Sequence, residues 1–163
     1  MFSVAIITLS DKGARGERED KSGPLIRRMM EEAGYRVAEE LLLSDDGEGL
    51  TRELVRIADG GLADLILTTG GTGFSPRDNA PEATLAAATR GAPGIAEAMR
   101  MNSLRITPRG MLSRAASAIR GRTLMVNLPG SPKAVAENLS YILDALGHGL
   151  CVLRGEAGDC AGA

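Results

Sequence analysis

Four glycine-rich or acidic segments each follow an apolar, strand-like run of the chain. The most conspicuous of them is Gly70-Gly71-Thr72-Gly73. Because glycine has no Cβ, successive backbone N–H groups can curl around phosphate oxygens, and the Thr72 hydroxyl adds a donor. The segment matches neither GxGxxG nor GxxxxGKS/T, which disfavours a Rossmann dinucleotide site and a Walker loop. It predicts an anion-binding loop; the alternative is a tight turn that needs glycine only for its backbone.

A second anion site is predicted where the last strand-like run meets a helix, at Pro129-Gly130-Ser131-Pro132-Lys133. The N–H groups of a helix N-terminus, the Ser131 hydroxyl and the Lys133 ammonium would all favour negative charge. The alternative is an ordinary N-cap at Ser131 with a solvated Lys133. Two such loops on one edge of a sheet shift the balance toward a binding site.

Carboxylates stand at the same places along the chain. Ser10-Asp11 and Asp45-Asp46 follow the first two strand-like runs, and Asp78 lies shortly beyond the glycine segment. Nucleotidyl transfer normally needs Mg²⁺, which binds one or two carboxylates together with water. Each aspartate could instead cap a helix, which is the commoner role at such positions.

The sequence offers no convincing catalytic nucleophile with a neighbouring general base, such as a Ser/His/Asp or a Cys/His arrangement. The single histidine, His148, follows the last predicted helix, where packing or surface exposure is expected. Cys151 and Cys160 fit neither a CxxC redox pair nor a zinc knuckle. Reduced thiols are favoured for them over a disulfide.

The elements that must position these segments can be predicted from hydrophobic patterns. Apolar runs rich in β-branched residues predict strands at 3–9, 37–43, 63–69 and 123–127. A helix with Ser22 as its cap ends at Gly34, and further helices are predicted at 50–58, 79–88, 94–104, 110–119 and 132–145. Strands alternating with helices predict a three-layer αβα sandwich with a mostly parallel sheet. Ligands of such sheets bind beyond the carboxyl ends of the strands.

Composition limits the class of protein. With 163 residues, 44% apolar and 25% charged, the chain should fold as one domain over residues 1–150. Residues 151–163 are expected to form a partly disordered tail. A net charge of −2 without like-charge runs argues against nucleic acid or an anionic membrane as partner. No signal-peptide pattern or roughly 20-residue apolar stretch is present, so a cytoplasmic protein is expected.

Several motifs resemble a known family. The segment TGGTGFSPRDNAPEAT at 69–84 resembles the signature of the MogA/MoaB family of molybdenum cofactor biosynthesis proteins. The family resemblance also covers the segments TLSD at 8–11, DKSG at 20–23, MLSRA at 111–115 and NLPGSPKA at 127–134. The match runs in order over about residues 3–148.

The resemblance implies an αβα domain that assembles as a homotrimer, or a hexamer in some members. It implies that Mg-ATP and molybdopterin are converted to adenylyl-molybdopterin and pyrophosphate. Two family carboxylates match Asp45 and Asp78, which would act in catalysis and bind Mg²⁺. The remaining segments would bind substrate or nucleotide through Ser10, Asp11, Gly70, Gly71, Thr72, Gly73, Arg77, Pro129, Gly130, Ser131 and Lys133.

The same resemblance raises two alternative functions. The chain could be a non-catalytic molybdopterin-binding or carrier protein of the MoaB type, although Arg77-Asp78 and the ending at 81–84 look more like the active branch. Molybdate insertion would need additional domains, which places this chain one step upstream. A transient contact with a molybdenum insertase is then expected.

Overall fold

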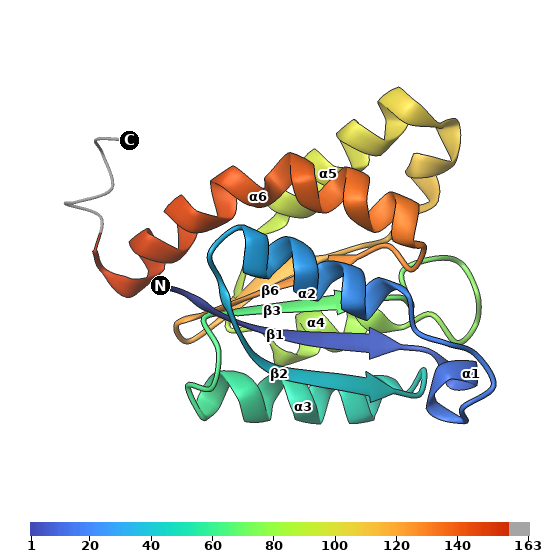
Figure 1. The fold of residues 1–163 in the computed structure, drawn as a ribbon, viewed down its shortest axis with the longest axis horizontal. Coiled ribbons are helices and arrows are strands. Elements are labelled where there is room, and N and C mark those ends of the chain that lie inside the picture. Colours follow the sequence, from blue (N-terminus) through green and yellow to red (C-terminus); the bar gives the residue numbers. More distant parts are fainter. Residues whose placement is uncertain (157–163) are drawn as a thin grey trace.

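The computed structural model describes residues 1–156 and contains one six-stranded sheet in the order β2-β1-β3-β6-β5-β4 (Figure 1). The four predicted strands are β1 (Ser3–Leu9), β2 (Arg36–Leu43), β3 (Leu65–Thr69) and β6 (Thr123–Leu128), and all four are parallel. The short strands β5 (Ser117–Arg120) and β4 (Arg90–Gly91) complete one edge, where β5 pairs with β6 and β4 pairs with β5, both in antiparallel orientation. The predicted mostly parallel sheet is confirmed.

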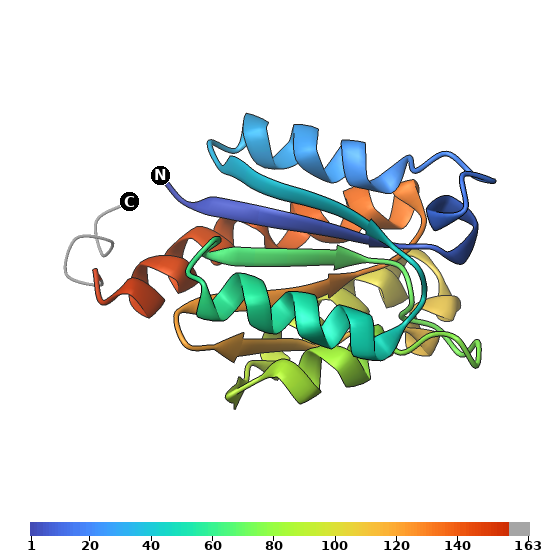
Figure 2. The ribbon, with the colours of Figure 1, turned by 90° about the horizontal axis from the view of Figure 1, so that it is seen from below.

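Helices cover both faces of the sheet (Figure 2). Their bounds are α1 (Asp11–Ala14), α2 (Ser22–Glu32), α3 (Gly47–Asp59), α4 (Ala80–Ala87), α5 (Pro93–Ile106), the 3₁₀ helix η1 (Pro108–Leu112) and α6 (Pro132–Arg154). Helices α2, α5 and α6 pack on one face, and α3 and α4 pack on the other. The predicted three-layer αβα sandwich is therefore confirmed.

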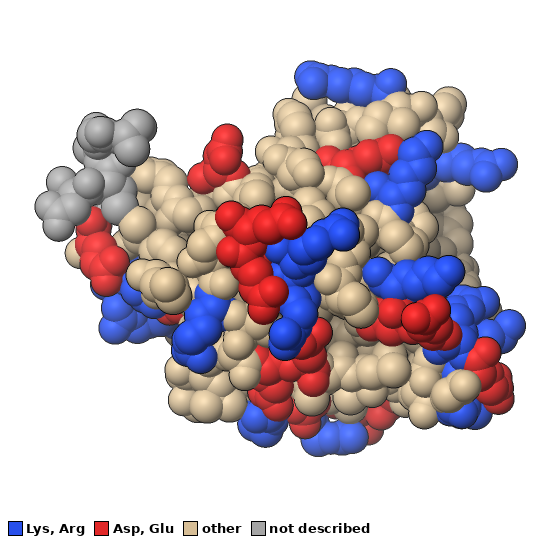
Figure 3. Space-filling view, viewed as in Figure 1, with Lys and Arg blue, Asp and Glu red and all other residues tan. Residues whose placement is uncertain are grey.

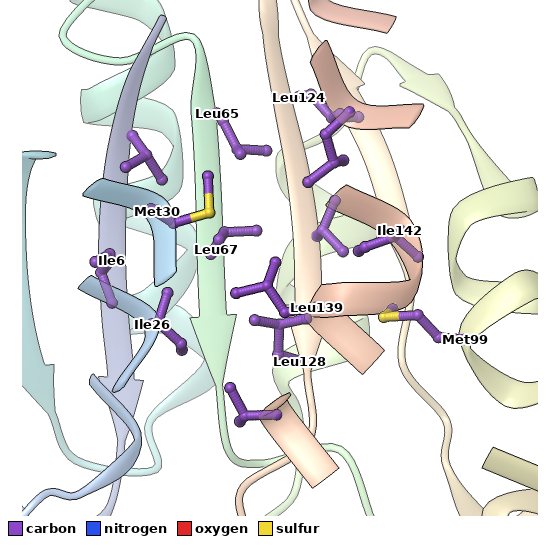
Figure 4. Close-up of a cluster of buried hydrophobic side chains, with 14 of the residues drawn as sticks. Ile6, Ile26, Met30, Leu65, Leu67, Met99, Leu124, Leu128, Leu139 and Ile142 are labelled. Carbon is purple, nitrogen blue, oxygen red and sulfur yellow. The ribbon is translucent and has the colours of Figure 1, made fainter. Parts of the chain in front are cut away.

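The central strands carry apolar side chains on both faces. In β1, Val4 and Ile6 belong to the cluster beneath α2, α5 and α6 (Figure 4), whereas Ala5 and Ile7 belong to the cluster beneath α3 and α4. Successive strand side chains point to opposite faces, so a strand covered on both sides needs a continuous apolar run. This explains the pattern from which these strands were predicted.

Acidic and basic side chains are interspersed over the face of the molecule shown in Figure 3. Arg27 of α2, for example, forms ion pairs with Glu31 and Glu40. Exposed pairs of this kind contribute only about 0–1 kcal/mol each. Burial of the two apolar clusters, rather than surface charge, holds the layers together.

The helix predicted at 110–119 is wrong. The chain forms η1 and then β5, whose Ser117 and Ala118 are buried against β6. Gly110 packs so closely on the C-terminal half of α5 that a Cβ there would lie 2.9 Å from the backbone nitrogen of Leu104. Pairing with β6 therefore overrides the helix-like spacing of the apolar residues.

The last helix is longer than the sequence predicts. It was expected to end at residue 145 before a tail without periodicity, but α6 continues to Arg154 and ends at Gly155 in the left-handed conformation, with φ of 82°. Burial of Leu146 and Leu150 stabilises this stretch despite its glycines. Residues 151–154 of the predicted tail therefore belong to α6, and residues 157–163 of that tail lie outside the described part of the chain. Within residues 1–156, no helix combines the length and the apolar character of a membrane span.

A carboxylate at the amino edge of the sheet anchors the end of α6. Asp64 accepts hydrogen bonds from the N–H and hydroxyl of Ser3 at 2.7 and 2.8 Å, and from Nε and Nη2 of Arg154 at 3.0 and 2.7 Å. Burial raises the pKa of Asp64, but the hydrogen bonds from Arg154 and Ser3 outweigh it and lower the pKa below its ordinary value. Asp64 thus joins the start of β1, the start of β3 and the end of α6.

Replacing Asp64 by Asn should lower the free energy of unfolding at pH 7 by about 2 kcal/mol, because charge-assisted hydrogen bonds are lost. A carboxylate with a depressed pKa stabilises the fold above its unfolded pKa, near 3.9, and loses this contribution as pH falls through its folded value. Urea unfolding of both proteins between pH 7 and 3 should show the difference shrinking below about pH 4. A difference that is independent of pH would contradict an ionic role for Asp64.

Candidate ligand-binding site

A cavity of about 660 Å³ opens at the carboxyl edge of the parallel strands. The arrowheads of β1, β2 and β3 point to this edge in Figure 1, and the register places Thr8, Thr69 and Leu128 side by side. The loops after all four parallel strands contribute to the wall, as expected for an open α/β sheet. Its lining residues are Thr8, Leu9, Ser10, Gly13, Arg18, Glu19, Asp20, Lys21, Ser22, Asp45, Thr69, Gly70, Gly71, Asp78, Gly130, Ser131 and Pro132.

The glycine loop after β3 has a backbone that only glycine adopts without strain. Gly70 and Gly71 have φ of 94° and 65°, and a Cβ on Gly70 would lie 2.5 Å from the carbonyl oxygen of Leu9. Both glycines line the cavity, whereas Thr72 and Gly73 do not. The geometry satisfies the tight-turn interpretation and also brings the first half of the loop to the cavity, so the two interpretations are compatible.

Arg114 fixes the second half of this loop. Its backbone N–H donates to the carbonyl of Thr72 at 2.9 Å, and its guanidinium donates to the carbonyls of Gly73 and Asp78 at 2.7 and 2.6 Å. The guanidinium also pairs with Glu82, and this hydrogen bond lowers the pKa of the Glu82 carboxyl. Sequence reasoning assigned no role to Arg114, although it stands in the MLSRA motif at 111–115.

The two predicted catalytic carboxylates line the same cavity. Asp45 Oδ2 accepts the N–H of Asp11 at 2.9 Å, and Asp78 Oδ2 accepts the N–H of Ser75 at 3.0 Å. Among the described residues, the Oδ1 atoms of Asp45 and Asp78 have no hydrogen-bond partner. Two carboxylates with free oxygen atoms in one cavity fit the modest demand of Mg²⁺, which completes its coordination with water and substrate phosphates. No cluster of three or more acidic, His or Cys ligands occurs in residues 1–156.

Asp11 connects the two loops that carry these carboxylates. Its carboxylate accepts the N–H of Asp45 at 3.0 Å and both Nε and Nη2 of Arg77 at 3.0 and 2.7 Å. The hydrogen bond from Arg77, followed by that from Asp45, lowers the pKa of Asp11. Neither Asp11 nor Arg77 lines the cavity. The structure gives these two predicted substrate-binding residues a contact with each other that holds the β2 loop against the β3 loop.

The segment between β1 and α2, where the sequence predicts no helix, contains α1, whose N-cap is Ser10. The Ser10 hydroxyl accepts the N–H of Gly13 at 2.9 Å. The predicted cap of α2 is also corrected, because Asp20 Oδ1 accepts the N–H groups of Ser22 and Gly23, both at 3.0 Å. The Ser22 hydroxyl instead donates to the carbonyl of Gly130 at 2.8 Å. Sequence reasoning assigned no ligand-binding role to Asp20 or Ser22, although DKSG at 20–23 belongs to the family-like motifs.

The loop after β6 combines a helix cap with a contribution to the cavity wall. Ser131 caps α6, accepting the N–H of Ala134 at 3.3 Å, and it also lines the cavity together with Gly130. Pro129 lies outside the lining, and its carbonyl accepts the hydroxyl of Thr69 at 2.6 Å. Lys133 also lies outside it, 83% exposed and 3.9 Å from Glu137. Lys133 is thus exposed, as in the alternative interpretation of a solvated lysine, and its role in substrate binding stays a prediction.

The other acidic, His and Cys residues considered from the sequence do not line the cavity or lie outside the described residues. Asp46 caps α3, since its two oxygens accept the N–H groups of Glu48 and Gly49. His148 is exposed on α6 and far along the chain from the cavity lining. Cys151 is a free thiol, and Cys160 lies outside the described residues.

The fold and the cavity define an α/β ligand-binding domain whose site is built at the carboxyl edge of its parallel strands. The family model described as "Probable molybdopterin binding domain" matches residues 5–148. The chain therefore belongs to this family of molybdopterin-binding domains, and the predicted resemblance to MogA and MoaB is confirmed.

Similar proteins agree with this assignment. The molybdopterin adenylyltransferase of Escherichia coli K12 is 37% identical, over 89% of this chain and 75% of that protein. The molybdopterin adenylyltransferase of Helicobacter pylori J99 is 34% identical, over 93% of this chain and 88% of that protein. The molybdopterin biosynthesis enzyme MoaB from Thermus thermophilus has a TM-score of 0.90 at 46% identity, covering 95% of this chain and 98% of its own.

The contact between Asp11 and Arg77 should govern the mobility of both loops. Asp11→Asn keeps the acceptor for the Asp45 N–H but loses the paired charge, so amides of residues 75–79 should exchange hydrogen faster while those of β1 and β3 stay protected. Hydrogen exchange followed by mass spectrometry measures this directly. Arg77→Met should reproduce the effect, and the double variant should add nothing further. Exchange changes confined to residue 11 and its neighbours would contradict a bridge between the loops.

Proposed function

We propose that this chain is a molybdopterin adenylyltransferase that uses Mg-ATP. One observation carries the proposal: Asp45, Asp78 and the glycine loop of Gly70 and Gly71 meet in a single cavity at the sheet edge. Two relatives named molybdopterin adenylyltransferase, which align over most of this chain, support the reaction. The cavity volume also lies within the range of about 300–1,000 Å³ that is typical of small-molecule sites.

The residues of the cavity have distinct tasks in this proposal. Asp45 and Asp78 would hold Mg²⁺, which when bound neutralises charge on the nucleotide phosphates. Gly70 and Gly71, whose positive φ values only glycine adopts without strain, would present the loop backbone to those phosphates. Ser131 and the N-terminus of α6, which begins next to the glycine loop, favour an anion at the same place.

The reaction requires little proton transfer from the protein. A phosphate monoester is already ionised near neutral pH, so the molybdopterin phosphate can attack the α-phosphorus of ATP without a general base. Alignment of the two phosphates and neutralisation of their charge are then the main tasks of the site. This agrees with a cavity whose lining contains carboxylates, hydroxyls and glycines but no His or Cys among the described residues.

Assembly and setting are inferred from the same family. We propose a homotrimer, with a hexamer as the alternative, and exposed apolar side chains on α5 and η1 provide surface for it. These side chains are Met101, Leu104, Ile106, Met111 and Leu112. We further propose that the reaction takes place in the cytoplasm and that the product passes to a molybdenum insertase by transient contact.

Replacing Asp78 by Asn should lower the turnover number by at least about 100-fold, since metal-directed charge is lost at the reacting phosphates. Asn can still accept the Ser75 N–H, so the melting temperature should change little. Asp45→Asn should behave in the same way. The measurement is pyrophosphate release and adenylyl-molybdopterin formation from purified protein, molybdopterin and Mg-ATP.

Asp46→Asn is the matched control, because it removes a neighbouring charge while Asn caps helices as well as Asp does. This variant should retain the wild-type rate. Full activity of Asp45→Asn or Asp78→Asn would refute the role of that carboxylate. If the wild-type chain bound molybdopterin but formed no product, the non-catalytic carrier function would replace the proposed one.

A further inference from the structure

The charged side chains of the cavity are distributed unevenly. Asp45 and Asp78 lie on the loops after β2 and β3, whereas both cations of the described lining, Arg18 and Lys21, lie on the segment between α1 and α2. Glu19 and Asp20 of that segment also line the cavity. The acidic side chains of the cavity lining therefore outnumber the basic ones. Arg18 and Lys21 are therefore the two side chains of the described lining that can form an ion pair with an anionic substrate.

The other cations near this edge are already engaged or lie elsewhere. Arg77 donates two hydrogen bonds to Asp11, and Lys133 lies outside the cavity lining. By contrast, the guanidinium of Arg18 and the ammonium of Lys21 form no ion pair or hydrogen bond with any residue of the described chain. Both residues are exposed and available to a ligand.

The N-terminus of α2 does not provide an alternative anion site. The N–H groups of Ser22 and Gly23, which a phosphate would otherwise use, both donate to Asp20 Oδ1. Asp20 Oδ2 in turn accepts the Thr8 hydroxyl at 2.7 Å, so this carboxylate is fully engaged in the fold. Recognition of a phosphate on this side of the cavity must come from the Arg18 and Lys21 side chains.

We propose that Arg18 and Lys21 bind the β- and γ-phosphates of the nucleotide and hold the departing pyrophosphate. The inference rests on the proposed adenylyl transfer, in which an oxygen of the pterin phosphate forms a bond to the α-phosphorus. The bond from the α-phosphorus to the bridging oxygen breaks, and its electron pair leaves on the pyrophosphate. Cations on this leaving group stabilise the developing charge, whereas cations on the attacking phosphate would weaken the nucleophile.

The first test measures ligand binding by the full chain without turnover. Arg18→Ala and Lys21→Ala should each weaken binding of inorganic pyrophosphate and of ATP by about tenfold, the loss expected for a charge-assisted hydrogen bond. AMP, which lacks the β- and γ-phosphates, should bind all variants and the wild type equally. Lys12→Ala and Arg15→Ala are matched controls, since both residues lie shortly before Arg18 in the chain but outside the lining. Equal pyrophosphate affinity in all five proteins would overturn the proposal.

The second test uses steady-state kinetics and separates this inference from the proposed function. In Arg18→Ala and Lys21→Ala the KM for ATP and the inhibition constant for pyrophosphate should rise, and the KM for molybdopterin should stay unchanged. A rise in the KM for molybdopterin alone would assign the cations to the pterin phosphate and overturn the inference. If the wild type bound pyrophosphate through these residues yet made no product, only the proposed adenylyl transfer would fail.

Discussion

The site depends on close backbone contact between loops at the carboxyl edge of the sheet. At Gly70 the backbone lies so near the Leu9 carbonyl that a Cβ would be 2.5 Å from its oxygen, and a Cβ on Gly130 would be 3.4 Å from Gly70 Cα. The loops after β1, β3 and β6 can therefore meet only because two of them carry glycine at the contact. This contact brings the predicted phosphate-binding loop and the start of α6 to the same cavity.

Hydrogen bonds between loops convert this contact into a defined arrangement of charge. Asp11 joins the Asp45 loop to Arg77, and Arg114 holds the stretch from Thr72 to Asp78. Ion pairs join Asp11 to Arg77 and Arg114 to Glu82, and none of these residues lines the cavity. The carboxylates of Asp45 and Asp78 line the cavity, and one oxygen atom of each accepts no hydrogen bond from the described residues. The residues that hold the loops together are thus different from the residues that face a ligand.

Hydrophobic patterning was sufficient to predict the layers, because β1, β3 and β6 are buried on both faces and show continuous apolar runs. The pattern failed at residues 110–119 and beyond residue 145, where long-range contacts decide. Strand β5 exists because it pairs with β6, and the end of α6 is anchored to Asp64, 90 residues earlier in the chain. Neither partner is visible in a local window of sequence.

The same limit applies to the site. Asp45 and Asp46 are adjacent and identical in type, yet both oxygens of Asp46 accept N–H groups of α3, whereas Asp45 contributes to the cavity. The sequence predicts that both aspartates follow a strand. Which of them caps α3 depends on the direction in which the chain enters that helix. Arg77 and Arg18 differ in the same way: the first is held by Asp11 and the second lines the cavity without a partner among the described residues. Residue type therefore indicates which chemistry is possible, and the local competition for hydrogen bonds determines which side chains remain available for it.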